Sequence, residues 1–309
     1  MSDIKLFKVS DNTVQELQGA SIAVEKTLQT LIENHLEAFL GIQFLKTEHP
    51  TGKTHGGRID TLGIDENGSP VIIEYKRALN ENVINQGLFY LDWLMDHKAE
   101  FELLVMKKLG DKAAGSIEWS APRLLCIASD FTRYDEHAVQ QINRNIELIR
   151  YRRYGSELIL FELVNAAISP AQSEINVASN GNGQKHKGAY QYKTVLELLE
   201  QSSSEIRDRF EALKAFLLAL GDDVQLKELK YYFAFRRIKN FACVEVHPQT
   251  KRILLFVKLD PSSINLEEGF TRDVHNVGHY GTGDLEITLQ SNEDLERAKP
   301  LLLKSYEVS

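Results

Sequence analysis

Apolar residues recur along the first half of the chain with two periods, one helical and one extended. Within residues 22–40 they return at steps of three and four, the spacing of one helix face. Residues 81–97 also have a helical pattern, and residues 135–152 predict an arginine-rich helix. Short apolar or alternating runs predict strands at Lys5–Val9, Arg58–Ile64, Val71–Lys76, Arg123–Ser129 and Leu158–Val164, with Leu103–Lys107 open between a strand and a helix end. This succession predicts an α/β domain with a mixed β-sheet flanked by helices.

A segment without large apolar residues interrupts this pattern at 169–189. It is rich in Ser, Asn, Gly and Gln, which is typical of a flexible linker. It separates an expected first domain, 1–168, from an expected second domain, 190–309. The second domain has helical patterns at 193–219, 224–233 and 292–305, and strand patterns at 241–247, 252–258 and 285–289. These elements predict a smaller α+β domain.

The strand patterns at 58–64 and 71–76, joined by the turn residues 65–70 with Asn-Gly at 67–68, predict a β-hairpin. Charged residues occur in this hairpin, where a buried strand should not carry them without a reason. Glu74 and Lys76 are two residues apart, so they project from the same face. Asp60 lies on the partner strand, thirteen residues before Glu74. A turn with an odd number of loop residues, such as 66–68 or 65–69, pairs residue 60 with residue 74. A two-residue Asn-Gly turn would pair it with residue 75, so we predict a bulged or longer turn.

Two carboxylates on adjacent strands with a lysine beside them suit metal-assisted phosphodiester hydrolysis. Mg²⁺ prefers oxygen ligands, and it can polarise a phosphoryl group and lower the pKa of a bound water. A lysine ammonium can orient that water or stabilise charge that develops on phosphate. The alternative is structural: Glu74 and Lys76 form a salt bridge at a sheet edge, and Asp60 lies in a turn.

The Asp60, Glu74 and Lys76 spacing, with Gly57-Arg58-Ile59 before it and a helix after it, resembles the PD-(D/E)XK nucleases. The similarity is greatest to the RecB-like branch that includes NucS-type mismatch endonucleases, and it spans about residues 22–95. It implies a restriction-endonuclease-like fold and a Mg²⁺ (or Mn²⁺) cofactor. It also implies site roles for Gln86 and Tyr90 on the following helix, and for Glu25, or secondly Glu33, on the preceding one. The alternatives are an ordinary helix face for Gln86 and Tyr90 and an exposed carboxylate for Glu25.

Nearly the whole chain is also similar to a family of bacterial proteins that join such a nuclease-like domain to a small C-terminal domain of unknown function. The N-terminal DNA-binding domain of the NucS-type enzymes has no counterpart in this sequence. Their mismatch specificity is therefore not an expectation for this protein.

Basic residues near the end of the predicted helix 135–152 interleave with Tyr151 and Tyr154. Arginine with tyrosine suits phosphate contact combined with base or sugar stacking. The alternative is a solvated basic helix end, favoured by the helix dipole. The residues expected to contact nucleic acid are Arg58, Arg150, Arg152 and Arg153.

Two segments of the second domain carry chemically versatile residues. Residues 231–241 mix aromatic and basic side chains, and we expect most of them in the core, with binding of nucleic acid or protein as the alternative. Asp273, His275 and His279 lie in a glycine-rich stretch before a strand. A turn into that strand is expected there, with a metal site as the alternative.

Composition limits the function classes that remain. The net charge of −8 disfavours a protein that coats nucleic acid by bulk electrostatics, although a local basic groove is compatible with it. No run of 18 apolar residues and no signal peptide are evident, and the two cysteines, Cys126 and Cys243, are expected as buried free thiols. These features predict a cytoplasmic protein without a membrane partner.

The sequence therefore predicts a metal-dependent endo- or exonuclease with an Asp/Glu/Lys site and nucleic acid, DNA in particular, as its partner. The alternative is a non-catalytic nucleic-acid- or protein-binding module on a nuclease fold. Cutting of both strands of a duplex would favour a homodimer.

Overall fold

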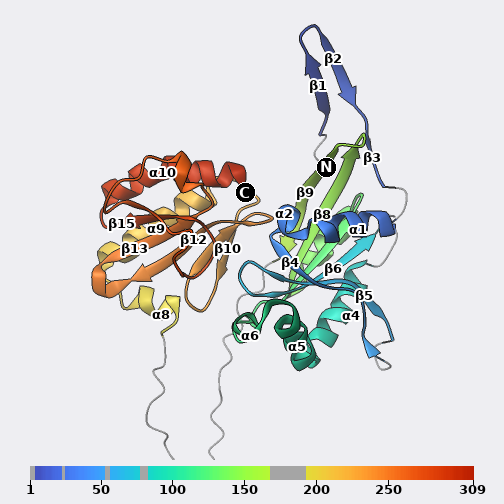
Figure 1. The fold of residues 1–309 in the computed structure, drawn as a ribbon, viewed down its shortest axis with the longest axis horizontal. Coiled ribbons are helices and arrows are strands. Elements are labelled where there is room, and N and C mark those ends of the chain that lie inside the picture. The colour runs from blue at the N-terminus through green and yellow to red at the C-terminus, as the bar shows by residue number, and fades with distance from the viewer. Residues whose placement is uncertain (1–3, 23–24, 53–55, 77–82, 168–192) are drawn as a thin grey trace, which may run out of the picture. The chain divides into compact units, whose positions relative to one another are not determined.

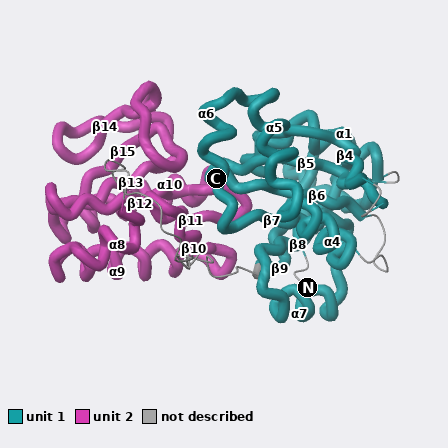
Figure 2. Tube along the Cα trace, turned by 90° about the horizontal axis from the view of Figure 1, so that it is seen from below, with its two compact units in different colours: residues 1–172 teal, residues 173–309 magenta. Residues whose placement is uncertain are grey.

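The computed structural model describes residues 4–22, 25–52, 56–76, 83–167 and 193–309, which divide into two units, 1–172 and 173–309 (Figure 2). The division lies inside the expected linker, 169–189, which itself falls outside the described residues. No helix of the described ranges combines the length and the apolar character needed to cross a membrane.

A seven-stranded mixed sheet organises the first unit (Figure 1). Its strand order is β3-β8-β7-β6-β5-β4. The strand β9 pairs with β8 along the edge opposite β7. The three central strands β6, β7 and β8 are parallel, and the remaining pairs are antiparallel. The strands are β3 (Gly19–Ala20), β4 (Ile42–Pro50), β5 (Arg58–Asp65), β6 (Pro70–Lys76), β7 (Arg123–Ala128), β8 (Asn145–Tyr154) and β9 (Leu158–Ala167); β1 (Leu6–Ser10) and β2 (Thr13–Leu17) form a separate hairpin.

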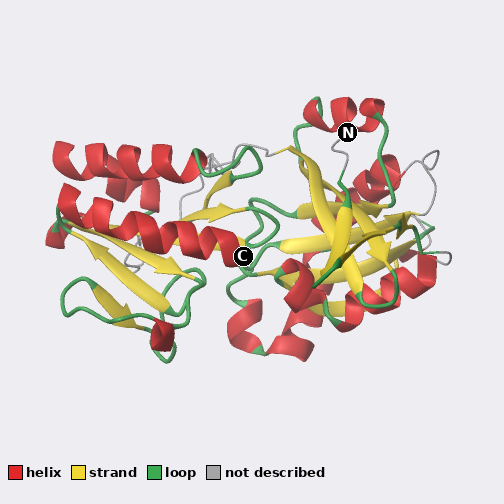
Figure 3. Cartoon of the chain, turned by 90° about the horizontal axis from the view of Figure 1, so that it is seen from above, coloured by secondary structure: helices red, strands yellow, loops and turns green. Residues whose placement is uncertain are grey.

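Helices lie on both faces of this sheet (Figure 3). Leu91 and Leu94 of α4 join one apolar cluster with Leu124 and Cys126 of β7, so α4 covers that face. On the opposite face Glu33 of α1 accepts a hydrogen bond from the buried Thr61. The helices are α1 (Glu25–Asn34), α2 (Leu36–Leu40), α4 (Val83–Asp96), α5 (Lys98–Leu109), α6 (Asp111–Ala114) and α7 (Arg133–Gln140). The expected α/β class, a mixed sheet flanked by helices, is confirmed.

The helix predicted over 135–152 is wrong beyond its first part. The helix α7 ends at Gln140, and the central strand β8 begins at Asn145. Residues 145–151 of β8, which pairs with β7 and β9, are all buried, so no exposed polar face marks the strand in the sequence. Its charged residues are accommodated by ion pairs with neighbouring elements. The strand β4 was also not predicted from its pattern, and Leu103–Lys107 lies inside α5.

One such ion-pair network ties the β5–β6 turn to β7 and β8. The Arg123 guanidinium donates from Nε and Nη2 to the two carboxylate oxygens of Glu147, at 2.7 and 2.8 Å, and from Nη1 to Asp65 at 2.9 Å. Burial opposes the guanidinium charge, but the two carboxylates outweigh it and raise the pKa of Arg123. Asp65 Oδ1 also accepts the backbone N–H groups of Asn67 and Ser69. The network therefore fixes the turn of the hairpin that carries Asp60 and Glu74.

The second unit is a six-stranded antiparallel sheet with three helices on one face. Its strand order is β10-β11-β12-β13-β15-β14. Val195, Phe210 and Leu302, one from each helix, share a core with the strands, so the α+β prediction is confirmed. The elements are α8 (Val195–Glu200), α9 (Ser204–Leu218), β10 (Gln225–Glu228), β11 (Phe233–Arg236), β12 (Asn240–His247), η1 (Pro248–Thr250), β13 (Arg252–Val257), η2 (Pro261–Ser263), β14 (Thr271–Asp273), β15 (Leu285–Leu289) and α10 (Asn292–Val308).

The helix predicted over 224–233 is wrong, because this segment contains the edge strand β10. Four residues are too few for a strand to show its period of two against a helical background. Most of the aromatic and basic stretch 231–241 is in the core, as expected, with Phe233, Phe235 and Phe241 fully buried. Both cysteines are buried and free, as predicted.

The glycine-rich stretch before β15 forms a turn, as expected. The Asp273 carboxylate accepts the backbone N–H of His275, and His275 Nδ1 lies 3.4 Å from a carboxylate oxygen of Asp284. The ring of His279 instead stacks on Phe256. The two histidines therefore have separate partners, and within the described ranges no group of three or more His, Cys, Asp or Glu side chains is arranged to hold a metal ion by itself.

Candidate active site

The register of the β5–β6 hairpin brings Asp60 opposite Glu74. The strands pair Thr61 with Ile73 and Ile64 with Pro70, which continues to residues 60 and 74. The turn is the longer one predicted: Asp65 N–H donates to the Ser69 carbonyl, and Gly68 N–H donates to the Asp65 carbonyl. Gly68 has φ +77°, a left-handed conformation that glycine adopts without a steric cost. The odd loop thus places both acids on one face of the sheet.

Asp60 and Glu74 each accept a hydrogen bond from the backbone of the other's strand. The backbone N–H of Asp60 donates to Glu74 Oε1 at 3.2 Å, and the backbone N–H of Tyr75 donates to Asp60 Oδ2 at 3.0 Å. Glu74 is fully buried, whereas Asp60 is half-buried. The second carboxylate oxygen of Glu74, Oε2, is buried and has no hydrogen-bond partner among the described residues. A buried, unsatisfied acceptor of this kind is rare and requires an explanation.

Burial makes both carboxylates hard to ionise. Desolvation raises the pKa of Asp60 to about 6, against the opposing hydrogen bond from Tyr75 and the charge of Lys76. Desolvation, followed by the charge of Asp60, raises the pKa of Glu74 to about 9. Burial and then the Glu74 charge raise the pKa of the neighbouring Cys126 thiol, which stays protonated. Without a bound cation, Glu74 is therefore protonated at neutral pH.

Lys76 and Glu25 lie within electrostatic range of this pair. The Lys76 ammonium, at the carboxyl end of β6, lowers the pKa of both acids, and the Glu25 carboxylate, at the start of α1, raises both. The structure thus brings together Asp60, Glu74, Lys76 and Glu25, from three separate elements.

The predicted Gln86 and Tyr90 share one face of α4 beside the start of β5. The Tyr90 hydroxyl accepts from the backbone N–H of Arg58 at 3.2 Å and from Gln86 Nε2 at 3.4 Å. Tyr90 is buried, and its hydrogen bond with the Arg58 backbone anchors β5 two residues before Asp60. These contacts place Tyr90 as a support of the site and leave Gln86 partly exposed beside it.

Gly57 is the residue that lets Tyr90 approach β5 so closely. A Cβ at position 57 would lie 2.6 Å from the Tyr90 hydroxyl oxygen and 2.8 Å from a ring carbon. Gly57→Ala is expected to displace the ring and cost about 1–3 kcal/mol of unfolding free energy. Urea unfolding measures this, and in a Tyr90→Phe background the cost should fall because the nearest atom is gone. Strictly additive losses in the double variant would contradict the proposed contact.

Glu33, the second candidate on α1, has a different role from Glu25. Its Oε1 accepts from Thr61 Oγ1 at 2.6 Å and from Gln29 Nε2 at 3.0 Å. Gln29 Nε2 also donates to the Asp60 carbonyl at 2.8 Å, and the hydroxyl oxygens of Thr61 and Tyr75 lie 3.3 Å apart. This network holds the β5 backbone at Asp60 from the α1 side, so Glu33 supports the strand.

The arginines predicted to contact nucleic acid fall into two groups. The Arg150 side chain is 3% exposed and forms ion pairs with Asp130 at 2.8 Å and Glu162 at 2.7 Å. The prediction for Arg150 is therefore corrected: it is a structural residue of the sheet, because the predicted helix end is the buried strand β8. Arg152 and Arg153 are partly exposed on that strand, and Arg58 is exposed.

The residue that sequence reasoning missed is Glu48 on β4. Its neighbours pair as Thr47 with Thr61 and His49 with Ile59, so Glu48 lies across from Asp60. Its charge raises the pKa of Asp60. The residues around Pro50 have a turn-rich composition, so the sequence did not predict β4, which extends to Pro50. Only pairing with β5 identifies Glu48 as a neighbour of the site.

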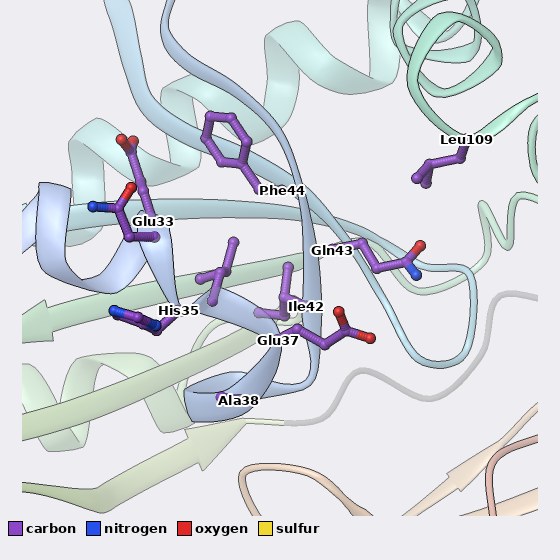
Figure 4. Close-up of a pocket in the computed structure, with 10 residues that line it drawn as sticks. Glu33, His35, Glu37, Ala38, Ile42, Gln43, Phe44 and Leu109 are labelled. Carbon is purple, nitrogen blue, oxygen red and sulfur yellow. The ribbon is translucent and has the colours of Figure 1, made fainter.

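A separate pocket of about 670 Å³ lies between α1, α2, β4 and the end of α5 (Figure 4). Glu33 and Glu37 are among the residues that line it (Figure 4). The lining contains neither Asp60 nor Glu74. This pocket therefore does not belong to the carboxylate pair.

The residues of the pair fit a hard divalent cation. Asp60, Glu74 and Glu25 supply carboxylate oxygens, and Glu74 Oε2 is buried without a hydrogen-bond partner among the described residues. No tight group of three potential ligands exists in the described ranges, but Mg²⁺ commonly uses one or two carboxylates, with waters and substrate oxygens completing its shell. Asp60 and Glu74, with Glu25 nearby, would hold it.

A family model described as a domain of unknown function (DUF5655) matches residues 196–309, within the second unit. A Haemophilus influenzae protein described as uncharacterized is 28% identical over 309 residues, which covers 98% of this chain and 100% of that protein.

Two solved structures overlap part of the chain. A repair endonuclease from Pyrococcus abyssi has 20% identity and a TM-score of 0.28, over 42% of this chain and 48% of that one. The structure of an EndoMS–dsDNA2 complex has 15% identity and a TM-score of 0.25, over 48% of this chain and 64% of that one. The chain thus spans less than two thirds of either structure.

Proposed function

We propose that the first unit is a metal-dependent nuclease that hydrolyses phosphodiester bonds, with DNA as its substrate. The observation that carries this proposal is the Asp60–Glu74 pair, in which the buried Glu74 Oε2 has no hydrogen-bond partner among the described residues. Such a pair is costly unless a cation compensates its charge. Lys76 at the same site adds a group that can contact a phosphate or an attacking water.

Asp60 and Glu74 would hold Mg²⁺ or Mn²⁺, supported by Glu25. When bound, such an ion polarises a phosphoryl group and lowers the pKa of a coordinated water. The Lys76 ammonium donates hydrogen bonds to the attacking water or to the phosphate oxygen on which charge develops. Tyr90 fixes the start of β5, and the Gln86 amide beside it can position the strand of the substrate.

The second candidate is a binding module without catalysis. The net charge of −8 and the structural role of Arg150 favour it, because both reduce the positive surface available to a polyanion. Metal-dependent cleavage separates the two candidates. Localisation in the cytoplasm and a homodimer stay predictions, and the dimer is testable by whether both strands of a duplex are cut.

Incubation with single-stranded, duplex, flapped and mismatched DNA, and with RNA, in Mg²⁺ or Mn²⁺ tests the proposal. Wild type is expected to cut at least one DNA substrate, and EDTA should stop the reaction. Asp60→Asn and Lys76→Met remove a metal ligand and the ammonium with little change in shape, so both should lose the activity. Lys107→Met, at an exposed position on α5, should retain it. Cleavage that persists in both site variants would overturn the assignment, and the absence of any cleavage by wild type would favour the binding module.

A further inference from the structure

The Glu48 backbone is strained where β4 passes the site. Glu48 has φ +48°, and in the described ranges Lys251, in a turn of the second unit, is the other non-glycine residue with positive φ. A side chain in this left-handed region inside a strand costs on the order of 1 kcal/mol or more, and it persists where the surroundings determine it. The position opposite Asp60 is therefore held by its contacts rather than by local preference.

Those contacts are two cations from different elements. Glu48 Oε1 accepts from Lys26 Nζ of α1 at 2.9 Å, and Glu48 Oε2 lies 3.5 Å from Arg58 Nη1 of β5. The hydrogen bond from Lys26, and then the charges of Lys26 and Arg58, lower the pKa of Glu48, so its carboxylate is ionised at neutral pH. One half-buried carboxylate thus joins two basic side chains beside Asp60.

Both cations remain accessible. The Lys26 side chain is 54% exposed and the Arg58 side chain 69%, whereas Glu48 is 31% exposed. Lys26 also donates to Gln29, whose amide donates to the Asp60 carbonyl, and the Arg58 backbone N–H donates to Tyr90. Each cation therefore belongs to a segment that is fixed against the strand carrying Asp60.

We propose that Lys26 and Arg58 form a clamp for a phosphate of the nucleic-acid strand beside the Asp60–Glu74 pair, and that Glu48 is the positioning residue that holds both cations for it. This inference rests on the proposed function. An ammonium and a planar guanidinium converge on the two oxygens of one carboxylate, and a phosphate presents a similar set of anionic oxygens. The incoming phosphate competes with Glu48 for them.

The role of Glu48 predicts opposite effects on binding and on turnover. Glu48→Gln keeps the shape but removes a negative charge that faces the phosphate. DNA affinity is expected to rise by about twofold to fivefold, the size of an exposed ion pair. The turnover number is expected to fall by about tenfold, because the cations are no longer fixed relative to the reacting phosphate. Glu48→Asp, which restores the charge, should recover part of the turnover. A merely structural role would not give this split.

Fluorescence anisotropy of a labelled duplex in Ca²⁺, titrated over a range of salt concentrations, tests the clamp itself. Each phosphate contact contributes about 0.9 to the slope of log K against log salt for duplex DNA. Lys26→Gln and Arg58→Gln should each lower the slope by about that amount, whereas Lys107→Gln, the charge-matched control, should leave it unchanged.

The outcomes separate the clamp from the proposed nuclease function. If wild type cleaves DNA but the slope is unchanged in Lys26→Gln and Arg58→Gln, the clamp is wrong and the nuclease stands. If wild type binds without cleaving and both variants lower the slope, the clamp stands and the nuclease is wrong. If wild type neither binds nor cleaves nucleic acid, both are wrong. Equal affinity and turnover in Glu48→Gln and wild type would remove Glu48 from the clamp.

Discussion

Glu74→Gln is expected to lower the rate of metal-dependent cleavage on the order of 10³-fold and, at the same time, to stabilise the metal-free protein at pH 8. Glutamine keeps the acceptor for the Asp60 N–H but removes the charge that burial opposes. The variant loses a metal ligand, and its folding at pH 8 no longer requires a buried carboxyl to take up a proton, as the raised pKa of Glu74 requires in wild type.

The stabilisation depends on pH with a definite sign. The pKa of Glu74 is raised from 4.5 to about 9 in the folded protein, and that of Asp60 from 3.8 to about 6. The folded state therefore holds protons that the unfolded state releases, and stability falls as pH rises through these windows. The wild type and Glu74→Gln should differ little near pH 4 and most near pH 9, by on the order of 2 kcal/mol, which is about 5 °C in Tm.

Tryptophan fluorescence isolates the relevant unit, since both tryptophans, Trp93 and Trp119, belong to the first one. Thermal unfolding in EDTA gives the metal-free comparison. Added Mg²⁺ should raise the Tm of wild type by mass action and leave that of Glu74→Gln unchanged. A Glu74→Gln variant that is less stable than wild type in EDTA at pH 8, or that responds equally to Mg²⁺, would show that Glu74 has a structural role.

Arg123→Met is expected to destabilise the first unit by about 3–5 kcal/mol. The substitution leaves two buried carboxylates, Asp65 and Glu147, without their shared guanidinium. It also releases the side chain that fixes the five-residue turn, and this turn sets the register of Asp60 against Glu74. The loss should therefore be much larger than for an exposed arginine.

Urea unfolding followed by tryptophan fluorescence measures this loss, and Arg144→Met, at an exposed position, provides the control, with a change within about 0.5 kcal/mol expected. The loss of unfolding free energy in Arg123→Lys should lie between those of Arg123→Met and Arg144→Met, because an ammonium keeps the charge but cannot make the two parallel bonds to Glu147. Equal midpoints for Arg123→Met and the control would show that the network contributes little.

The core of the candidate site could be predicted from the sequence because its residues are neighbours in one hairpin. Side chains alternate with a period of two, so the spacing from Asp60 to Glu74 and the polar turn residues between them were enough to predict the register. The same reasoning could not reach Glu48, which joins the site through the pairing of β4 with β5. It also placed Arg150 on an exposed helix end, whereas the guanidinium is buried between Asp130 and Glu162.

The sequence by itself determined the parts of this protein in which local pattern and final environment agree. The helices α4 and α10 each bury one side and show it in their periodicity, and the apolar runs of β5 and β6 flank a polar turn. The tertiary structure decided the rest. β8 is a strand because β7 and β9 cover both its edges, and its charges find partners on other elements. Likewise, the role of the Glu48 charge depends on its ion pairs with Lys26 and Arg58. These residues come together only when α1, β4 and β5 are packed. Burial and ion pairing join residues far apart in the chain, and no local pattern records them.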